Sequence, residues 1–181
     1  ISKGNIEDTS EFTYELYLTK EKNMKIQTRA FGEVDIEDDK IITFTDGIIG
    51  YPELTKFALI YDKEKGSSSI QWLQSVDEPG FALPVMNPLI VCPDYNPVVE
   101  DTILKPVGNL DENDMLVLVT VTIPKDIKEI SVNLRGPIVI NANECRACQV
   151  ILDDEEYKIK FPIYDILEKN KNDKKNKKAG E

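Results

Sequence analysis

Two groups of residues have the types and spacing that can carry out chemistry. Four consecutive acids occupy residues 153–156, and Cys145 and Cys148 are separated by two residues. A pair of carboxylates can hydrolyse a glycosidic bond, and a pair of thiolates can hold zinc or exchange electrons. Histidine, the commonest general base and zinc ligand, does not occur in the chain. The acids and the thiols are therefore the first candidates for catalysis or metal binding.

The surroundings of both groups argue against these chemistries. Consecutive acids between two strands are typical of a solvated loop, and they lack the ligand spacing of a calcium loop. Structural zinc needs four ligands, and Cys92 is the only further thiol. A redox thiol pair precedes a helix, whereas the strand-like residues 149–152 follow this pair. We therefore predict no catalytic residues, no metal site and no cofactor, and we interpret the protein as not an enzyme.

The charge of the chain is acidic and unevenly distributed. The formal net charge is −11, but residues 169–181 hold six lysines and two acids, so this segment carries +4 and the rest −15. Nucleic-acid-binding proteins usually have a basic surface, so the acidic body favours a basic protein partner over RNA or DNA. No apolar run approaches the ~20 residues of a membrane span, and no signal-peptide pattern opens the chain. We expect a cytoplasmic protein with no membrane contact.

Short apolar segments separated by turn residues dominate the chain from Met24 onward. We expect strands at residues 26–30, 34–36, 41–44, 57–61, 70–75, 81–86, 89–91, 115–123, 130–134, 137–141, 149–152 and 157–161, a helical turn at 52–56 and a short helix from 164. The prolines of residues 84–97 favour edge strands and irregular segments there. This pattern predicts an all-β fold, a single antiparallel β-barrel-like domain with short irregular or helical connections.

The same pattern divides the chain into three parts. Residues 1–23 are an N-terminal extension of uncertain status, in which residues 12–18 alternate weakly like a strand. Residues 24–166 form the β domain. Residues 167–181 have the lysine-rich, apolar-poor composition of a disordered basic tail.

Four segments resemble the FliW family of flagellar assembly factors. They are FTDGIIGYPE at residues 44–53, WLQSVDEPGF at 72–81, VNLRGPIVIN at 132–141 and QVIL at 149–152. Their order and spacing agree with the family from Met24 to about Asp165. Gly136 stands where the family often has alanine, and the two C-x-x-C cysteines are outside the family pattern.

The resemblance implies a regulatory role in the cytoplasm. A member of this family binds flagellin and, once flagellin is exported, binds and antagonises the translational repressor CsrA, so that flagellin synthesis resumes. We expect the free protein to be a monomer. Three alternatives stay open: a generic acidic β adaptor that binds another basic protein or peptide at a sheet edge, a carbohydrate-active enzyme using acid pairs, and RNA binding through the lysine tail.

Six residues are the candidates for partner binding. Polar residues beside a turn are good interface candidates, which favours Gln74, Ser75, Asp77 and Glu78. Tyr95 is an aromatic in an irregular segment, and Asn133 lies in the third family segment. Asn133 and Asn141 also have a structural interpretation, because asparagine side chains bond to nearby backbone and hold turns.

Overall fold

The computed structural model describes residues 23–61 and 70–178. The strands are β1 (Asn23–Thr28), β2 (Gly32–Glu37), β3 (Ile42–Phe44), β4 (Lys56–Ile60), β5 (Gln71–Ser75), β6 (Ala82–Met86), β7 (Met115–Thr122), β8 (Ser131–Val132), β9 (Ile138–Asn141), β10 (Arg146–Gln149) and β11 (Phe161–Pro162). The α-helix of this part is α2 (Tyr164–Lys178), and short 3-10 turns lie in the connections. The weak strand expected at residues 12–18 lies outside the described residues.

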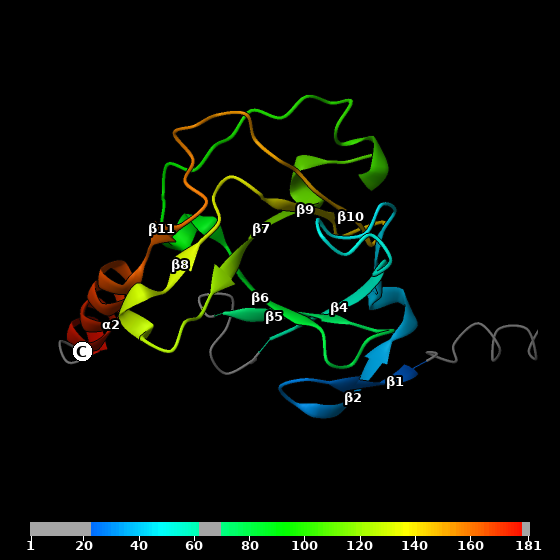
Figure 1. The fold of residues 1–181 in the computed structure, drawn as a ribbon, viewed down its shortest axis with the longest axis horizontal. Helices are drawn as coiled ribbons and strands as arrows, with labels where there is room; N and C mark the ends of the chain where they lie inside the picture. The colour runs from blue at the N-terminus through cyan, green and yellow to red at the C-terminus, as the bar shows by residue number, and fades with distance from the viewer. Residues whose placement is uncertain (1–22, 62–69, 179–181) are drawn as a thin grey trace, which may run out of the picture.

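Seven strands close into a barrel. β7, β6, β5, β4, β3, β10 and β9 are neighbours in that order, and β9 pairs back onto β7 (Figure 1). Each of these pairings is antiparallel except that of β3 with β10, which is parallel. An odd number of strands cannot alternate in direction all the way round a closed ring, so one parallel seam is unavoidable. The predicted β-barrel is confirmed, and this seam is its departure from an all-antiparallel arrangement.

Alternating apolar residues fill the barrel. In β3 the side chains of Ile42 and Phe44 are buried while Thr43 between them is exposed, as the two-residue period of a strand requires. Phe44 packs edge-on against Phe57 of β4, with ring centroids 5.2 Å apart. Each such fully buried side chain stabilises the fold by roughly 1.5–3 kcal/mol.

A second cluster lies outside the barrel and anchors α2. β7 turns Leu118 into the barrel and Val119 and Val121 toward this second cluster. Ile163 and Leu167, around the first turn of α2, complete the packing. β7 is therefore the wall shared by both clusters.

Several local predictions are wrong. Residues 52–56 form no helical turn, because the Leu54 amide closes a single turn on the Tyr51 carbonyl and β4 then begins at Lys56. Just before it, Ile48 and Tyr51 pair across a tight turn in which Gly50 has a positive φ that favours glycine. Residues 89–91 lie in a 3-10 turn, since Pro88 begins it and the Asn87 side chain accepts from the Leu89 amide.

The other errors concern the C-terminal part of the chain. Of residues 149–152 only Gln149 is in a strand, because β10 begins earlier, at Arg146, and ends at Gln149. Within residues 157–161 only Phe161 is in a strand, because the Asp154 side chain accepts from the Glu156 amide and sets a turn there. The disordered tail expected from residue 167 is helical as far as Lys178, where α2 ends.

Candidate interaction surface

Gln74 and Ser75 are buried parts of the β5–β6 hairpin. The Gln74 side chain is 1% exposed, and its amide nitrogen donates to the carbonyls of Ser75, Pro79 and Phe81 at 3.0–3.1 Å. Its oxygen accepts from the Arg29 amide at 2.8 Å, which ties the β1–β2 hairpin to the barrel. These contacts give both residues a structural explanation and leave little of them for a partner.

Asp77 and Glu78 lie at the exposed tip of the same hairpin. The Glu78 amide donates to the Ser75 hydroxyl at 3.0 Å, so a buried side chain holds the turn while both acidic residues are exposed to solvent. Of the four polar residues predicted beside this turn, these two are therefore placed where a partner can reach them.

Tyr95 and Asn133 also hold the backbone. The buried Tyr95 hydroxyl donates to the Leu134 carbonyl at 2.7 Å and its ring packs edge-on against Tyr157. Burial, with smaller effects of Tyr157 and Cys92, raises the pKa of the Tyr95 phenol above its ordinary value. The Asn133 side-chain oxygen accepts from the Arg135 amide at 3.0 Å. Both residues fasten the segment between β8 and β9.

The cysteines are unpaired thiols. Cys145 lies in the turn before β10 with a φ of 50°, and its sulfur contacts the Asp39 carbonyl at 3.0 Å. Burial raises the pKa of the Cys145 and Cys148 thiols above the ordinary value. A raised pKa leaves less thiolate at neutral pH, so these thiols are poorly suited to redox exchange.

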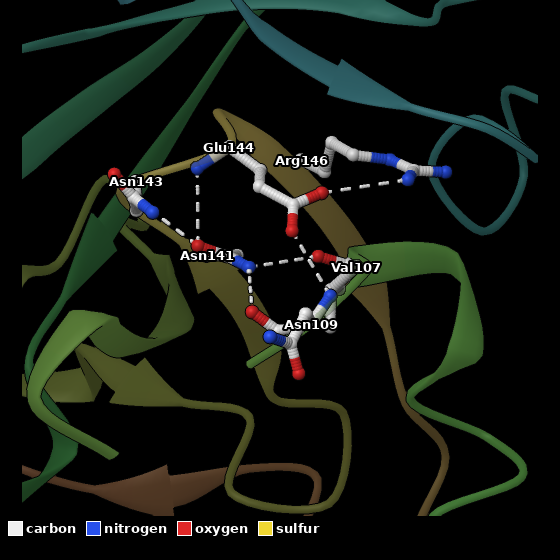
Figure 2. A network of polar contacts seen from close by, with 6 residues as sticks. All are labelled: Val107, Asn109, Asn141, Asn143, Glu144 and Arg146. Carbon is white, nitrogen blue, oxygen red and sulfur yellow. Dashed lines mark hydrogen bonds and ion pairs between the residues drawn. The ribbon is translucent and has the colours of Figure 1, made fainter. Parts of the chain in front are cut away.

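Asn141 organises a polar network at one end of the barrel (Figure 2). Its side chain is fully buried, and its nitrogen donates to the carbonyls of Val107 and Asn109, both at 3.0 Å. Its oxygen accepts from the amides of Asn143 and Glu144, both at 3.1 Å. The predicted turn-holding role of Asn141 is confirmed, and it extends to a loop more than thirty residues away in sequence.

Glu144 strengthens the same network. Its carboxylate accepts from the Asn109 amide at 3.0 Å and lies 3.6 Å from the Arg146 guanidinium. A Cβ at Gly108 would meet the Glu144 carboxylate and displace it from this network, and the positive φ of 80° at Gly108 favours glycine. The β9–β10 turn and the loop at residues 107–109 are thus held as one unit.

Two apolar clefts open on the outside of the barrel. The first, of about 420 Å³, lies between β7 and β9 and the long connection from β6 to β7. The second, of about 670 Å³, lies beside α2 and is lined by Met86, Ile130 and Leu167 among others. The prolines of residues 84–97 predicted irregular structure near the first cleft. The clefts themselves were not predicted from the sequence, because they are formed by segments that are distant in the chain.

The described residues hold no metal-binding cluster and no membrane-spanning helix. Within residues 23–61 and 70–178, no group of three or more histidine, cysteine or acidic side chains is placed to hold a metal ion. No helix in that same part of the chain is both long and apolar enough to cross a bilayer. The arrangement that the structure does offer is a rigid barrel with apolar clefts, which is suited to binding.

These features define the class: a small, closed β-barrel protein with apolar clefts on its outer face. The family model described as FliW protein matches residues 25–163. The chain therefore belongs to the FliW family, and α2 lies beyond the matched residues.

Individual relatives agree with this assignment. A protein of Lachnospira eligens named flagellar assembly factor FliW is 46% identical over 151 residues, covering 82% of this chain and 100% of the relative. One from Treponema denticola with the same name is 37% identical, covering 77% of this chain and 93% of the relative. A crystal structure of the flagellar assembly factor FliW superposes with a TM-score of 0.71 at 29% identity, covering 78% of this chain and 97% of that one.

Proposed function

We propose that this protein is a cytoplasmic flagellar assembly factor that binds flagellin and, when flagellin has been exported, antagonises the translational repressor CsrA. The observation that carries the proposal is the family match over residues 25–163, together with relatives named flagellar assembly factor that are 33–46% identical. The protein acts by binding and not by catalysis.

The charge of the chain supports a CsrA partner. CsrA binds RNA, so its surface should carry positive charge. The sequence outside the lysine-rich segment carries a formal charge of −15, which steers a basic partner toward it. A bound acidic body repels RNA, so the repressor would be antagonised even if its RNA site stayed uncovered.

The exposed acids of the β5–β6 hairpin are the proposed contacts on this protein. Asp77 and Glu78 project from a turn that the buried Gln74 holds rigid, so their carboxylates are presented without a large loss of conformational freedom on binding. The other four candidate residues contribute to partner binding indirectly, because they hold the backbone on which a contact surface depends. They are Gln74, Ser75, Tyr95 and Asn133.

Calorimetric titration with flagellin and, separately, with CsrA from the same source tests the proposal. We expect dissociation constants of about 1 µM or tighter for both, and competition between the two. The double variant Asp77→Asn, Glu78→Gln should weaken binding to one of these two partners about tenfold. The matched control is Asp153→Asn, Glu155→Gln, which removes the same charge from another exposed loop. A folded protein that binds neither partner would leave only the generic acidic β adaptor.

A further inference from the structure

The two edges of β7 differ in how they are hydrogen-bonded. On one edge the Asn133 amide donates to the Thr120 carbonyl, and the Ala142 amide donates to the Asp114 carbonyl. Backbone groups of successive residues in a strand point to opposite edges. The even-numbered residues of β7 therefore face β8 and β9, and the odd-numbered residues, Val117 among them, face the edge occupied by β6.

β6 covers that edge only in part. Its register pairs Val85 with Thr120 and Met86 with Val119, and then stops. The next residue in register with Val117 would be Pro88, which has no amide hydrogen, and its carbonyl already accepts from the amides of Val91 and Cys92. Among the described residues, the backbone groups of Val117 therefore have no partner on this edge.

Met115 continues the open edge to the end of the strand. It is also odd-numbered, and no backbone or side-chain bond outside the ladder with β9 is made to it within residues 23–61 and 70–178. Its side chain is 42% exposed. The open stretch thus spans two outward-facing residues of β7, which is enough for a short segment of added strand.

The first apolar cleft lies alongside this open edge. Its lining includes Met115 and Val117 themselves, with Leu89, Val99 and Val139 around them. Leu89 is 51% exposed, so apolar surface is left in contact with water in the free protein. An occupant would gain both backbone hydrogen bonds and apolar contacts.

The charge next to the cleft indicates the charge of the occupant. Asp94, Glu100 and Asp114 directly adjoin the lining residues Tyr95, Val99 and Met115, whereas Lys105 is the basic residue adjoining Leu104. This excess of acids favours lysine or arginine beside the bound segment. A second copy of this chain fits poorly, because its own formal charge is −11.

We propose that the edge of β7 at Met115 and Val117 is a docking site for an extended peptide segment of a basic protein partner. The segment adds as a strand beside β7, places alternate apolar side chains in the first cleft and sets its basic residues near the surrounding acids. A helical segment does not suit this edge, because its backbone groups are already bonded within the helix. The inference deepens the proposed function, since it describes how a protein partner is held.

The first test uses random twelve-residue peptides displayed on phage and selected on the full chain, so it is independent of flagellin and CsrA. We expect selected peptides to alternate apolar residues and to carry lysine or arginine. Peptides with a helical apolar period, acidic peptides, or no enrichment at all would overturn the inference. Flagellin and CsrA can fail to bind in calorimetry while this selection succeeds, so the two proposals fail separately.

The second test removes one hydrogen-bond donor. Val117→Pro deletes an amide that faces away from β9, so the β7–β9 ladder is kept, and Val117→Thr is the matched control with the amide retained. The selected peptides should bind Val117→Pro about tenfold or more weakly and Val117→Thr as well as the unchanged protein. Equal binding to both variants, or a dimer in size-exclusion chromatography that Val117→Pro dissociates, would overturn the proposal.

Amide hydrogen exchange keeps the proposal testable if Val117→Pro does not fold. In the free protein the amides of Met115 and Val117 should exchange about a hundredfold faster than those of Leu116 and Leu118, which face β9. Addition of a selected peptide should slow the Val117 amide about tenfold or more. A Val117 amide that is already protected in the free chain, or unchanged by the peptide, contradicts an open edge that docks a strand.

Discussion

Asn141 shows how one polar side chain in the core connects distant segments. Its four hydrogen bonds satisfy two carbonyls of the loop at residues 107–109 and two amides of its own turn. A buried side chain with every polar atom bonded stabilises a specific structure, whereas the same group left partly unbonded is costly. An exchange of donors for acceptors at this position should therefore be poorly tolerated.

We expect Asn141→Asp to destabilise the protein by about 2–4 kcal/mol. The aspartate keeps the oxygen that accepts from two amides, but it places an acceptor against the carbonyls of Val107 and Asn109. Urea unfolding measures the free energy. Asn143→Asp makes the same chemical change at an exposed side chain and should cost about 0.5 kcal/mol or less. Equal losses for the two variants would contradict the role given to the network.

Tyr95 makes stability depend on pH in the alkaline range. The folded protein raises the pKa of its phenol, first through burial, while in the unfolded chain the phenol ionises near its ordinary value of 10.0. The contribution of Tyr95 to the free energy of unfolding is therefore fully present below pH 10. It declines as the pH rises from there toward the higher pKa of the folded state. The slope over that window is about 1.4 kcal/mol per pH unit.

Tyr95→Phe separates this effect from general alkaline unfolding. The variant should lose about 1–2 kcal/mol at pH 8, because the buried Leu134 carbonyl loses its donor, and its stability should then fall less steeply above pH 10. Tyr61→Phe, at a side chain that is exposed, is the control and should keep the steep slope. Urea unfolding at pH 8 and pH 11 provides the measurement, and parallel slopes for all three proteins would rule out the assignment.

At the scale of the element, α2 has two halves with different roles. Ile166 and Leu167 pack against the second cluster, and the Asn170 side chain donates to the Ile90 carbonyl at 3.3 Å. The second half, from Lys171 to Lys178, is exposed and carries lysines near the helix C-terminus, where positive charge is favourable. The exposed half of the helix is thus supported mainly by the packing of the first half.

Removal of residues 171–181 should lower the free energy of unfolding by less than about 1 kcal/mol. The deleted half contributes an exposed ion pair, Lys171 with Glu168 at 2.7 Å, and exposed pairs are weak. Leu167→Ala, in the packed half, should cost about 1–3 kcal/mol. Urea unfolding of both variants compares them directly, and a truncation as damaging as Leu167→Ala would show that the exposed half carries stabilising contacts.

The open edge of β7 also has its explanation at the scale of elements, because β6 pairs with only part of this strand. Val119 is paired with Met86, while Pro88 opposite Val117 and the 3-10 turn that it begins end the ladder. Proline ends strand pairing because it lacks a donor. The barrel therefore closes through β9 and leaves the first residues of β7 available on the other side.

At the scale of the whole molecule, net charge and barrel rigidity act together. The closed barrel holds the clefts and the β5–β6 hairpin in place, and the acidic charge sets which partners approach. An electrostatically steered encounter is fast at low ionic strength and slows as salt screens the charges.

We expect the association rate constant with CsrA to fall about tenfold between 50 mM and 500 mM salt, while the dissociation rate changes little. Stopped-flow or surface-based kinetics at several salt concentrations measures both constants. An association rate that is independent of salt would show that charge does not steer the partner.

The sequence by itself determined the β class and the positions of most strands. The alternation around Phe44, the valine-rich run of β7 and the family segments each depend on near neighbours in the chain, where the two-residue period is visible. The turn-holding role of Asn141 was also predictable, because asparagine bonds to local backbone.

Only the tertiary structure decided what depends on contacts between distant residues. The burial of Gln74 follows from its bond to the Arg29 amide, the parallel seam from an odd number of strands in a closed ring, and the length of α2 from the packing of its first half. The open edge of β7 likewise requires knowing which strands flank it. A local pattern shows which face of a segment is apolar. Which strand pairs with each edge, and which edge stays unpaired, is decided by closure of the whole barrel.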